Sequence, residues 1–162
     1  MNALTFENLM RRHSRMLYRA ARAILRDDAA AEEALQEAWL RAYRAIDTFR
    51  GESKLSTWLV RIAVNEALAR RRKDQRSLAV GGEAEPVTLE QDEPEGMAQR
   101  SELRRRLYGE ISDLPPAFRS VFMLRAVEGL TVGETAAALH IPESTVRTRF
   151  FRARGQLREA LS

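Results

Sequence analysis

The side chains with the clearest binding chemistry form a run of arginines and hydroxyl residues near the C-terminus. Arginine donates paired hydrogen bonds to a phosphate or to a base edge, and hydroxyl groups contact either. From Glu143 to Glu159 every charged residue in between is basic, and the run comprises Ser144, Thr145, Arg147, Thr148, Arg149, Arg152 and Arg154. The pattern predicts a surface for a polyanion, although a solvated basic face on an ordinary helical bundle has a similar composition.

The residues around this run have the layout of a helix-turn-helix. Thr131 and Glu134 have capping-box spacing, in which the hydroxyl and the carboxylate each accept a hydrogen bond from an orphan backbone amide. We expect a short helix to Leu139, a tight connection at 140–142 and a last helix to about Ala160. The crossing of the two helices should be held by Ala136, Leu139, Ile141 and Val146. Such a motif lays its second helix in the major groove of DNA.

Glu143, at the start of the predicted second helix, is the acidic exception. A carboxylate accepts a hydrogen bond from cytosine but repels phosphate. It could equally serve only the helix dipole. The sequence therefore leaves open which DNA sequence the helix would read.

The sequence gives little support to catalysis. His13 and His140 are isolated, and there is no glycine-rich phosphate loop and no cluster of metal ligands. With no cysteine, disulfides and cysteine-ligated zinc are excluded. We expect no enzyme activity, no cofactor, no metal and no small-molecule substrate.

Charge divides the chain into three parts. Residues 1–76 carry 16 Lys/Arg and 10 Asp/Glu (+6), residues 77–98 carry only 6 acidic residues (−6), and residues 99–162 carry 11 basic and 7 acidic (+4). The middle part also holds Gly81, Gly82, Pro86 and Pro94 and few large apolar residues, so it cannot support a packed core. We expect two small helical domains, 1–76 and 99–162, joined by a flexible acidic linker.

Apolar periodicity predicts that both domains are all-α. The first helix should bury a stripe of Leu4, Leu9, Met16, Leu17, Ala20, Ala21, Ile24 and Leu25. Asp27 or Asp28 should cap the second helix, whose core face comprises Ala31, Ala34, Leu35, Ala38, Trp39, Ala42, Tyr43 and Ile46. A third helix is expected over 57–73, after a turn at 49–56. In the C-terminal part, helices are expected over 99–111 and from Phe118 to near Gly129.

The N-terminal part carries a family resemblance. The segment Phe49-Arg50-Gly51-Glu52-Ser53-Lys54-Leu55-Ser56-Thr57-Trp58-Leu59, with Asn65 and the basic tail Arg70–Lys73, resembles the second conserved region of extracytoplasmic-function (ECF, group IV) sigma factors. The segment from Glu33 to Tyr43 resembles the family's polymerase-binding helix. The C-terminal part, from Leu114-Pro115 to Arg154, resembles the fourth region, which is a helix-turn-helix.

The resemblance implies three binding surfaces. The polymerase clamp would contact a polar face that holds one apolar residue, although a lone exposed leucine is common. This face comprises Glu33, Gln36, Glu37, Leu40 and Arg44. A flipped base of the minus-ten element would be captured by Phe49, Arg50, Gly51, Glu52, Ser53, Lys54, Thr57 and Asn65, with Arg61 and Arg72 on the DNA backbone. The minus-thirty-five element would be bound by the C-terminal run. Packing in the core remains the alternative for Phe49 and is preferred for Trp58.

The resemblance also implies partners and a location. A sigma factor binds core RNA polymerase, at its clamp and flap, and promoter DNA, and an anti-sigma factor is expected to hold it inactive. With no residues after Ser162, we expect control from a separate protein. The acidic linker, with Glu83, Glu85, Glu90, Asp92, Glu93 and Glu95, would enter the polymerase cleft or act as a passive tether. No signal-peptide pattern or membrane-length apolar run is present, so we expect a cytoplasmic protein without membrane insertion.

Two other classes remain as alternatives. A conventional helix-turn-helix regulator would bind an operator as a free dimer and need no polymerase. A sigma-like decoy would bind an anti-sigma factor but not DNA, and the arginines of the last helix argue against it. The sequence does not reveal the inducing signal, the anti-sigma partner, the promoter sequence or the organism.

Overall fold

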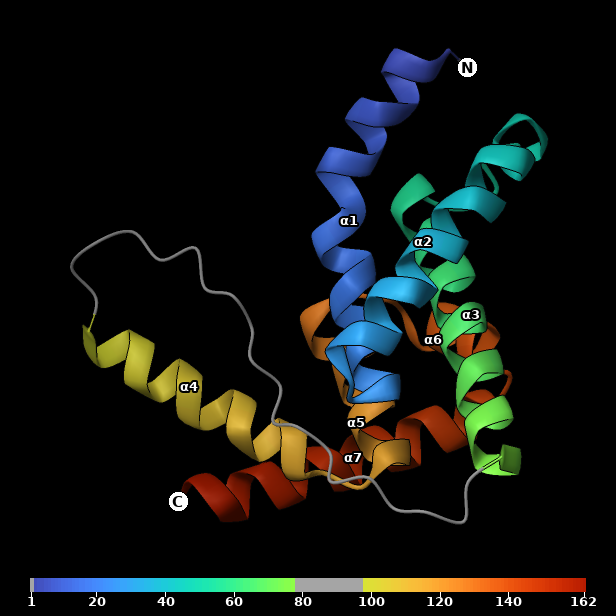
Figure 1. Cartoon of the computed structure of the whole chain (residues 1–162). Coiled ribbons are helices and arrows are strands. Elements are labelled where there is room, and N and C mark those ends of the chain that lie inside the picture. Colours follow the sequence, from blue (N-terminus) through green and yellow to red (C-terminus); the bar gives the residue numbers. More distant parts are fainter. Residues whose placement is uncertain (1, 78–97) are drawn as a thin grey trace.

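The structure of the protein is a computed structural model that describes residues 2–77 and 98–162 (Figure 1). The acidic residues of the predicted linker lie outside these ranges. Within them every regular element is helical, as predicted: α1 (Ala3–Leu25), α2 (Asp28–Ala45), η1 (Ile46–Thr48), α3 (Leu55–Ser77), α4 (Ala98–Asp113), α5 (Pro116–Phe122), η2 (Met123–Val127), α6 (Val132–Leu139) and α7 (Glu143–Leu161).

Local capping sets the path of the N-terminal block, which comprises α1 to α3. The side chain of Asn2 accepts a hydrogen bond from the Thr5 amide, and Asp27 accepts one from the Ala30 amide, at 2.8 and 2.7 Å. Asp27 is therefore the cap of the second helix. Between α1 and α2, Arg26 takes the left-handed conformation, with φ 55°. This short reversal lets α2 fold back along α1.

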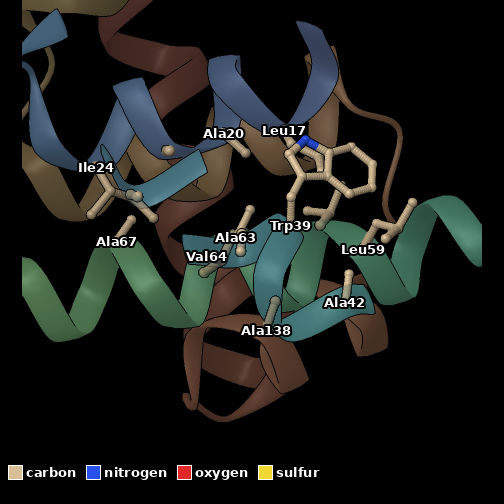
Figure 2. Packing of buried hydrophobic residues seen from close by; sticks show 14 of the residues in the cluster. Leu17, Ala20, Ile24, Trp39, Ala42, Leu59, Ala63, Val64, Ala67 and Ala138 are labelled. Atoms are coloured by element: carbon tan, nitrogen blue, oxygen red, sulfur yellow. The ribbon is translucent and has the colours of Figure 1, made fainter. Parts of the chain in front are cut away.

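The core of this block is built largely from alanines facing larger side chains (Figure 2). Leu17 and Ile24 of α1 belong to this core together with Ala63 and Ala67 of α3, and all four are at most 4% exposed. Trp39 of α2 is 5% exposed, and its indole nitrogen donates to the Ser14 hydroxyl at 3.0 Å. The small residues let the three helices approach closely, so the predicted stripes are largely confirmed.

Two residues of the predicted stripes are outside the core. Leu4 is 68% exposed and Tyr43 is 55% exposed. Phe6 is buried instead of Leu4, because it lies three helical turns before Leu17 and so on the same face of α1. The Phe6 ring contacts Trp39 and Tyr43, with ring centroids 5.6 and 5.1 Å away. Tyr43 thus contributes only one side of its ring to the edge of the core.

The C-terminal block, α4 to α7, contains the predicted helix-turn-helix. Thr131 and Glu134 form the capping box, with hydrogen bonds of 2.9 and 3.0 Å. Ala136 and Val146 are buried at the crossing of α6 and α7 against Val121. His140 makes the turn in the left-handed conformation, with φ 57°. The predicted helix through Phe118 ends in a π-turn, η2, where the amide of Glu128 donates to the Met123 carbonyl.

The two blocks share one core, which the sequence analysis did not predict. Leu124, Leu130 and Ala138 of the C-terminal block belong to the cluster formed by α1, α2 and α3. Figure 2 shows Ala138 of α6 close to Val64 of α3. Helix α6 packs along α3, and α5 packs against the C-terminal half of α1 (Figure 1). The described residues form one body.

Candidate nucleic-acid interface

Helix α7 presents its basic residues because its apolar residues anchor it from behind. Val146, Ala153 and Leu157 are at most 5% exposed, and their spacing turns one face of the helix toward the core. On the other sides lie all seven residues predicted from the sequence. The exposed members are Ser144, Arg147, Thr148, Arg152 and Arg154, and the half-buried members are Thr145 and Arg149.

These seven residues divide between two sides of α7. A shallow groove of about 260 Å³ is lined by Phe118 of α5 and by Ser144, Thr145, Thr148, Arg149 and Arg152. Arg147 and Arg154 instead border a second groove of about 340 Å³, with Phe150 and Phe151. The guanidinium of Arg154 lies over the Phe150 ring, 5.7 Å from its centroid. Arg147 lies 3.6 Å from the carboxylate of Glu143, so this carboxylate already has a cation beside it.

Phe151 is a residue that the sequence analysis missed. Its side chain is 79% exposed, which is unusual for phenylalanine, and it lies one helical turn after Arg147. An exposed ring beside arginines can contact a thymine methyl group or a sugar. Its position four residues after Arg147, away from the buried stripe of α7, was the signal available in the sequence.

The predicted minus-ten turn has an open side and a buried side. Gly51 adopts φ 77°, a conformation that favours glycine, and nothing lies within 4 Å of the position its Cβ would take. Arg50, Glu52 and Lys54 are exposed around it, and Ser53 is half-buried. Phe49 is half-buried against Trp58, with ring centroids 5.3 Å apart and the rings tilted by 44°. Trp58 also packs against the core.

Helix α3 carries the remaining residues of the predicted minus-ten surface. Arg61, Asn65 and Arg72 are all exposed, and their spacing places them on one face of the helix. Thr57 differs from them, because it is 5% exposed and faces Glu134 of α6, whose pKa it helps to lower. The structure therefore separates Thr57 from the open residues of this surface.

The predicted polymerase face lies on α2, away from these surfaces. Glu33, Gln36, Leu40 and Arg44 are exposed, and the side chain of Glu37 is 39% exposed. Leu40 is 51% exposed and has the exposed ring of Tyr43 three residues away. Glu33 pairs with Arg70 of α3 at 2.8 Å. Together, Leu40 and Tyr43 present a larger exposed apolar surface to a partner than Leu40 would present alone.

Polar contacts join the two predicted DNA-binding regions. The Oδ1 atom of Asn65 lies 2.9 Å from Nε2 of His140, in the turn before α7. The capping residue Glu134 reaches α3 as well, through Thr57. Hydrogen bonding to the Thr131 amide is the main reason why the pKa of Glu134 is lowered. The helix-turn-helix thus contacts the surface predicted to read the minus-ten element.

Buried charges lie at the same junction. Arg119 of α5 is 1% exposed, and its Nε donates to the carbonyl of Ala23, at the end of α1, at 2.7 Å. Burial, with the nearby cation Arg26 as the next cause, lowers the pKa of Arg119 to about 10. No group of three or more potential ligands that could hold a metal ion occurs in residues 2–77 and 98–162. In the same ranges no helix is long and apolar enough to cross a membrane.

Comparisons with known proteins agree with this architecture. Residues 9–77 match the family model of sigma-70 region 2, and residues 104–157 match that of sigma-70 region 4. The chain is 40% identical over 131 residues to the ECF RNA polymerase sigma-E factor of Escherichia coli, covering 75% of this chain and 69% of that protein. It is 36% identical over 144 residues to the RNA polymerase sigma-H factor of Pseudomonas aeruginosa, covering 83% and 75%.

Solved structures share the fold. The sigma factor RpoE of Bartonella quintana, in complex with the anti-sigma factor NepR, matches with a TM-score of 0.78 and 21% identity, over 97% of this chain and 96% of that one. CnrH, in complex with the cytosolic domain of CnrY, matches with a TM-score of 0.64 and 26% identity, over 99% and 89%. The match of both sigma-70 regions, in order, and the identity to sigma-E show that this chain belongs to the ECF sigma factor family.

Proposed function

We propose that this sigma factor directs core RNA polymerase to promoters by reading two DNA elements with separate surfaces. The observation that carries the proposal is the exposed basic face of α7, fixed on a capped helix-turn-helix by buried Val146 and Ala153. At the minus-thirty-five element, Ser144, Arg147 and Thr148 contact base edges. Thr145, Arg149, Arg152 and Arg154 contact phosphates, which contribute affinity without sequence choice.

The minus-ten element is captured by the turn at 49–57 and by α3. A melted base stacks near Phe49 and hydrogen-bonds to Asn65, whose amide offers both a donor and an acceptor. Gly51 and its exposed polar neighbours admit the base and its phosphate. Arg61 and Arg72 contact the backbone of the duplex upstream.

Core polymerase binds the exposed face of α2. Leu40 and Tyr43 supply the apolar contact, and Glu33, Gln36, Glu37 and Arg44 supply the polar rim. The protein acts in the cytoplasm, where the polymerase is, and has no catalytic activity of its own. An anti-sigma factor holds it inactive, by analogy with RpoE of Bartonella quintana, whose structure was solved with the anti-sigma factor NepR.

Run-off transcription tests the proposal. Purified core polymerase, with and without this protein, is offered a library of candidate promoters. We expect specific transcripts only when the protein is present, and their loss in the double variant Asn65→Ala/Arg147→Ala. Arg158→Ala serves as the control, because Arg158 is exposed on α7 but lies outside the proposed surface.

A conventional helix-turn-helix regulator predicts a different result. Such a protein would leave core polymerase unbound and would bind a duplex operator tightly as a free dimer. Sedimentation of the protein with core polymerase, beside an operator selection with the free protein, distinguishes the two classes. Operator binding without polymerase binding would overturn the proposal.

A further inference from the structure

An ion pair between Arg41 of α2 and Glu66 of α3 joins the helix of the proposed polymerase face to the helix of the proposed minus-ten reader. Nε of Arg41 contacts Oε1 of Glu66. The side chain of Glu66 is 9% exposed, whereas that of Arg41 is 62% exposed. Taking a carboxylate out of water is costly unless a cation lies beside it. Glu66 therefore depends on Arg41, and this dependence ties α3 to α2 at one point.

Each member of the pair lies directly beside a residue of the proposed function. Arg41 follows Leu40, the apolar residue of the proposed polymerase face, and Glu66 follows Asn65, the proposed base reader. Successive residues point about 100° apart around a helix axis. Once Glu66 is held toward α2, the direction in which Asn65 leaves α3 is therefore set as well.

The apolar part of the interface between α2 and α3 fixes the rotation of α3 only weakly. Four of the five buried residues of α2 are alanines, and the fifth, Trp39, is hydrogen-bonded to Ser14 of α1. Helix α3 contributes Ala63 and Ala67 to the same core (Figure 2). Ridges of side chains that fit into grooves set how two helices turn against each other, and alanines make low ridges. Polar pairs at the edge of this interface therefore have a large part in setting the rotation.

A second ion pair follows the first along the same two helices. Glu33 of α2 and Arg70 of α3 lie 2.8 Å apart, eight residues before Arg41 and four residues after Glu66. The two pairs thus lie along one edge of two antiparallel helices. Glu33 is 66% exposed and Arg70 is 31% exposed, so solvent screens this pair more than the one with the buried carboxylate. The pair of Arg41 and Glu66 is the stronger constraint on α3.

We propose that Arg41 and Glu66 are positioning residues for promoter melting. Their ion pair fixes the rotation of α3 against α2, and so holds Asn65 in place for the displaced base while polymerase occupies α2. The inference rests on the proposed roles of Asn65 and of the face around Leu40. It deepens them by assigning the contact through which the polymerase-bound helix sets the position of the base reader.

Glu66→Gln tests the positioning role with the smallest change of shape. It removes the charge that holds Arg41 and leaves no unpaired charge in the interior. Arg41→Ala should reproduce its effect, whereas Arg41→Lys keeps a cation within reach of Glu66. Glu102→Gln is the matched control, because Glu102 is exposed on α4, outside both helices. Circular dichroism checks that each variant is folded.

The rate of promoter opening measures how well Asn65 is placed. Core polymerase carrying each variant is mixed with a promoter found by run-off transcription, in which a fluorescent adenine analogue in the minus-ten element reports the displaced base. We expect Glu66→Gln and Arg41→Ala to slow opening about tenfold, because a displacement of about 1 Å can cost up to about 100-fold in rate. Arg41→Lys and Glu102→Gln should open the promoter at nearly the natural rate. The affinity of Glu66→Gln for core polymerase should stay at its natural value.

A double-mutant cycle separates positioning from a general effect on stability. If Glu66 acts through Asn65, Glu66→Gln should slow opening no further once Asn65→Ala is present. A purely structural role would give additive losses, together with weaker binding to polymerase. Additive losses, or an opening rate that Glu66→Gln leaves unchanged, would rule out the positioning role.

The same cycle separates this inference from the proposed function. If Asn65→Ala slows opening and Glu66→Gln acts independently of it, the proposed base capture stands and the positioning role fails. If Asn65→Ala leaves opening unchanged, the proposed base capture fails, and the positioning role that rests on it fails as well.

Discussion

Arg19 of α1 and Glu128, just after η2, form an ion pair between the two blocks, with Nε of Arg19 2.9 Å from Oε1 of Glu128. The side chain of Glu128 is 1% exposed, whereas that of Arg19 is 27% exposed. Burial raises the pKa of Glu128, although the hydrogen bond from Arg19 opposes this shift. The carboxylate therefore depends on its partner more than the guanidinium does.

Removing this cation should destabilise the fold. We expect Arg19→Ala to lower the free energy of unfolding at pH 7 by about 2–3 kcal/mol, because an uncompensated buried charge remains. Adding Glu128→Gln should restore most of the loss, since no buried charge is then left. Urea unfolding measures both. A loss that persists in the double variant would mean that Arg19 acts through packing. Arg11→Ala is the control: it removes an exposed ion pair with Glu7 within α1 and should cost under about 0.5 kcal/mol.

The same carboxylate should give stability a pH dependence of definite sign. Because its pKa is raised by folding, the contribution of Glu128 is fully present at low pH and is lost as the pH rises through the raised pKa. Glu128→Gln should therefore gain stability relative to the natural sequence as the pH rises from about 4 to about 7. Urea unfolding at a series of pH values tests this, and a constant difference would contradict it.

The capping box of Thr131 and Glu134 should contribute to stability with a pH dependence opposite to that of Glu128. Thr131→Ala should cost about 1 kcal/mol, whereas Thr131→Ser keeps the hydroxyl and should cost much less. The lowered pKa of Glu134 means that its contribution is present above the usual range for glutamate and is lost as the pH falls through the lowered pKa. The difference in melting temperature between Glu134→Gln and the natural sequence should therefore shrink as the pH falls, which thermal unfolding at a series of pH values measures.

Leu40 should matter for polymerase binding and not for folding. Because it is 51% exposed, Leu40→Ala should leave the melting temperature nearly unchanged. We expect the affinity for core polymerase to fall about tenfold, as for an apolar anchor at an interface. Leu103→Ala is the control, since Leu103 is 62% exposed on α4, outside the proposed face. Equal effects of the two substitutions would argue against a specific site on α2.

Arg72 and Arg147 should differ in what they contribute to promoter binding. Arg72→Ala should weaken binding of the polymerase complex similarly at all promoters and reduce the salt slope by about 1, as a phosphate contact does. Arg147→Ala should instead change the preferred minus-thirty-five sequence, with a loss of about 1–3 kcal/mol at the preferred one. Binding to a promoter library at several salt concentrations separates the two. Identical profiles would contradict this division.

The sequence by itself determined the helices and their family. Caps at Asp27 and Thr131, the alanine-rich stripe of α2 and the basic run of α7 are local patterns, because a helix's period and its orphan amides involve residues only a few positions apart. The resemblance carried by the segment from Phe49 to Leu59 then predicted the ECF family. The two wrong predictions within helices, Leu4 and Tyr43, lie near helix ends. There the apolar period does not show whether a neighbouring helix extends far enough to cover the side chain.

Only the tertiary structure decided how the two blocks meet. The contact of Asn65 with His140, the pair of Arg19 with Glu128 and the burial of Arg119 join residues far apart in the chain, and each is polar. Apolar periodicity carries no signal for such contacts, since a charged or amide side chain reads as solvent-facing wherever it lies. A side chain that the sequence predicts to contact DNA, such as Asn65, can therefore be hydrogen-bonded within the folded chain.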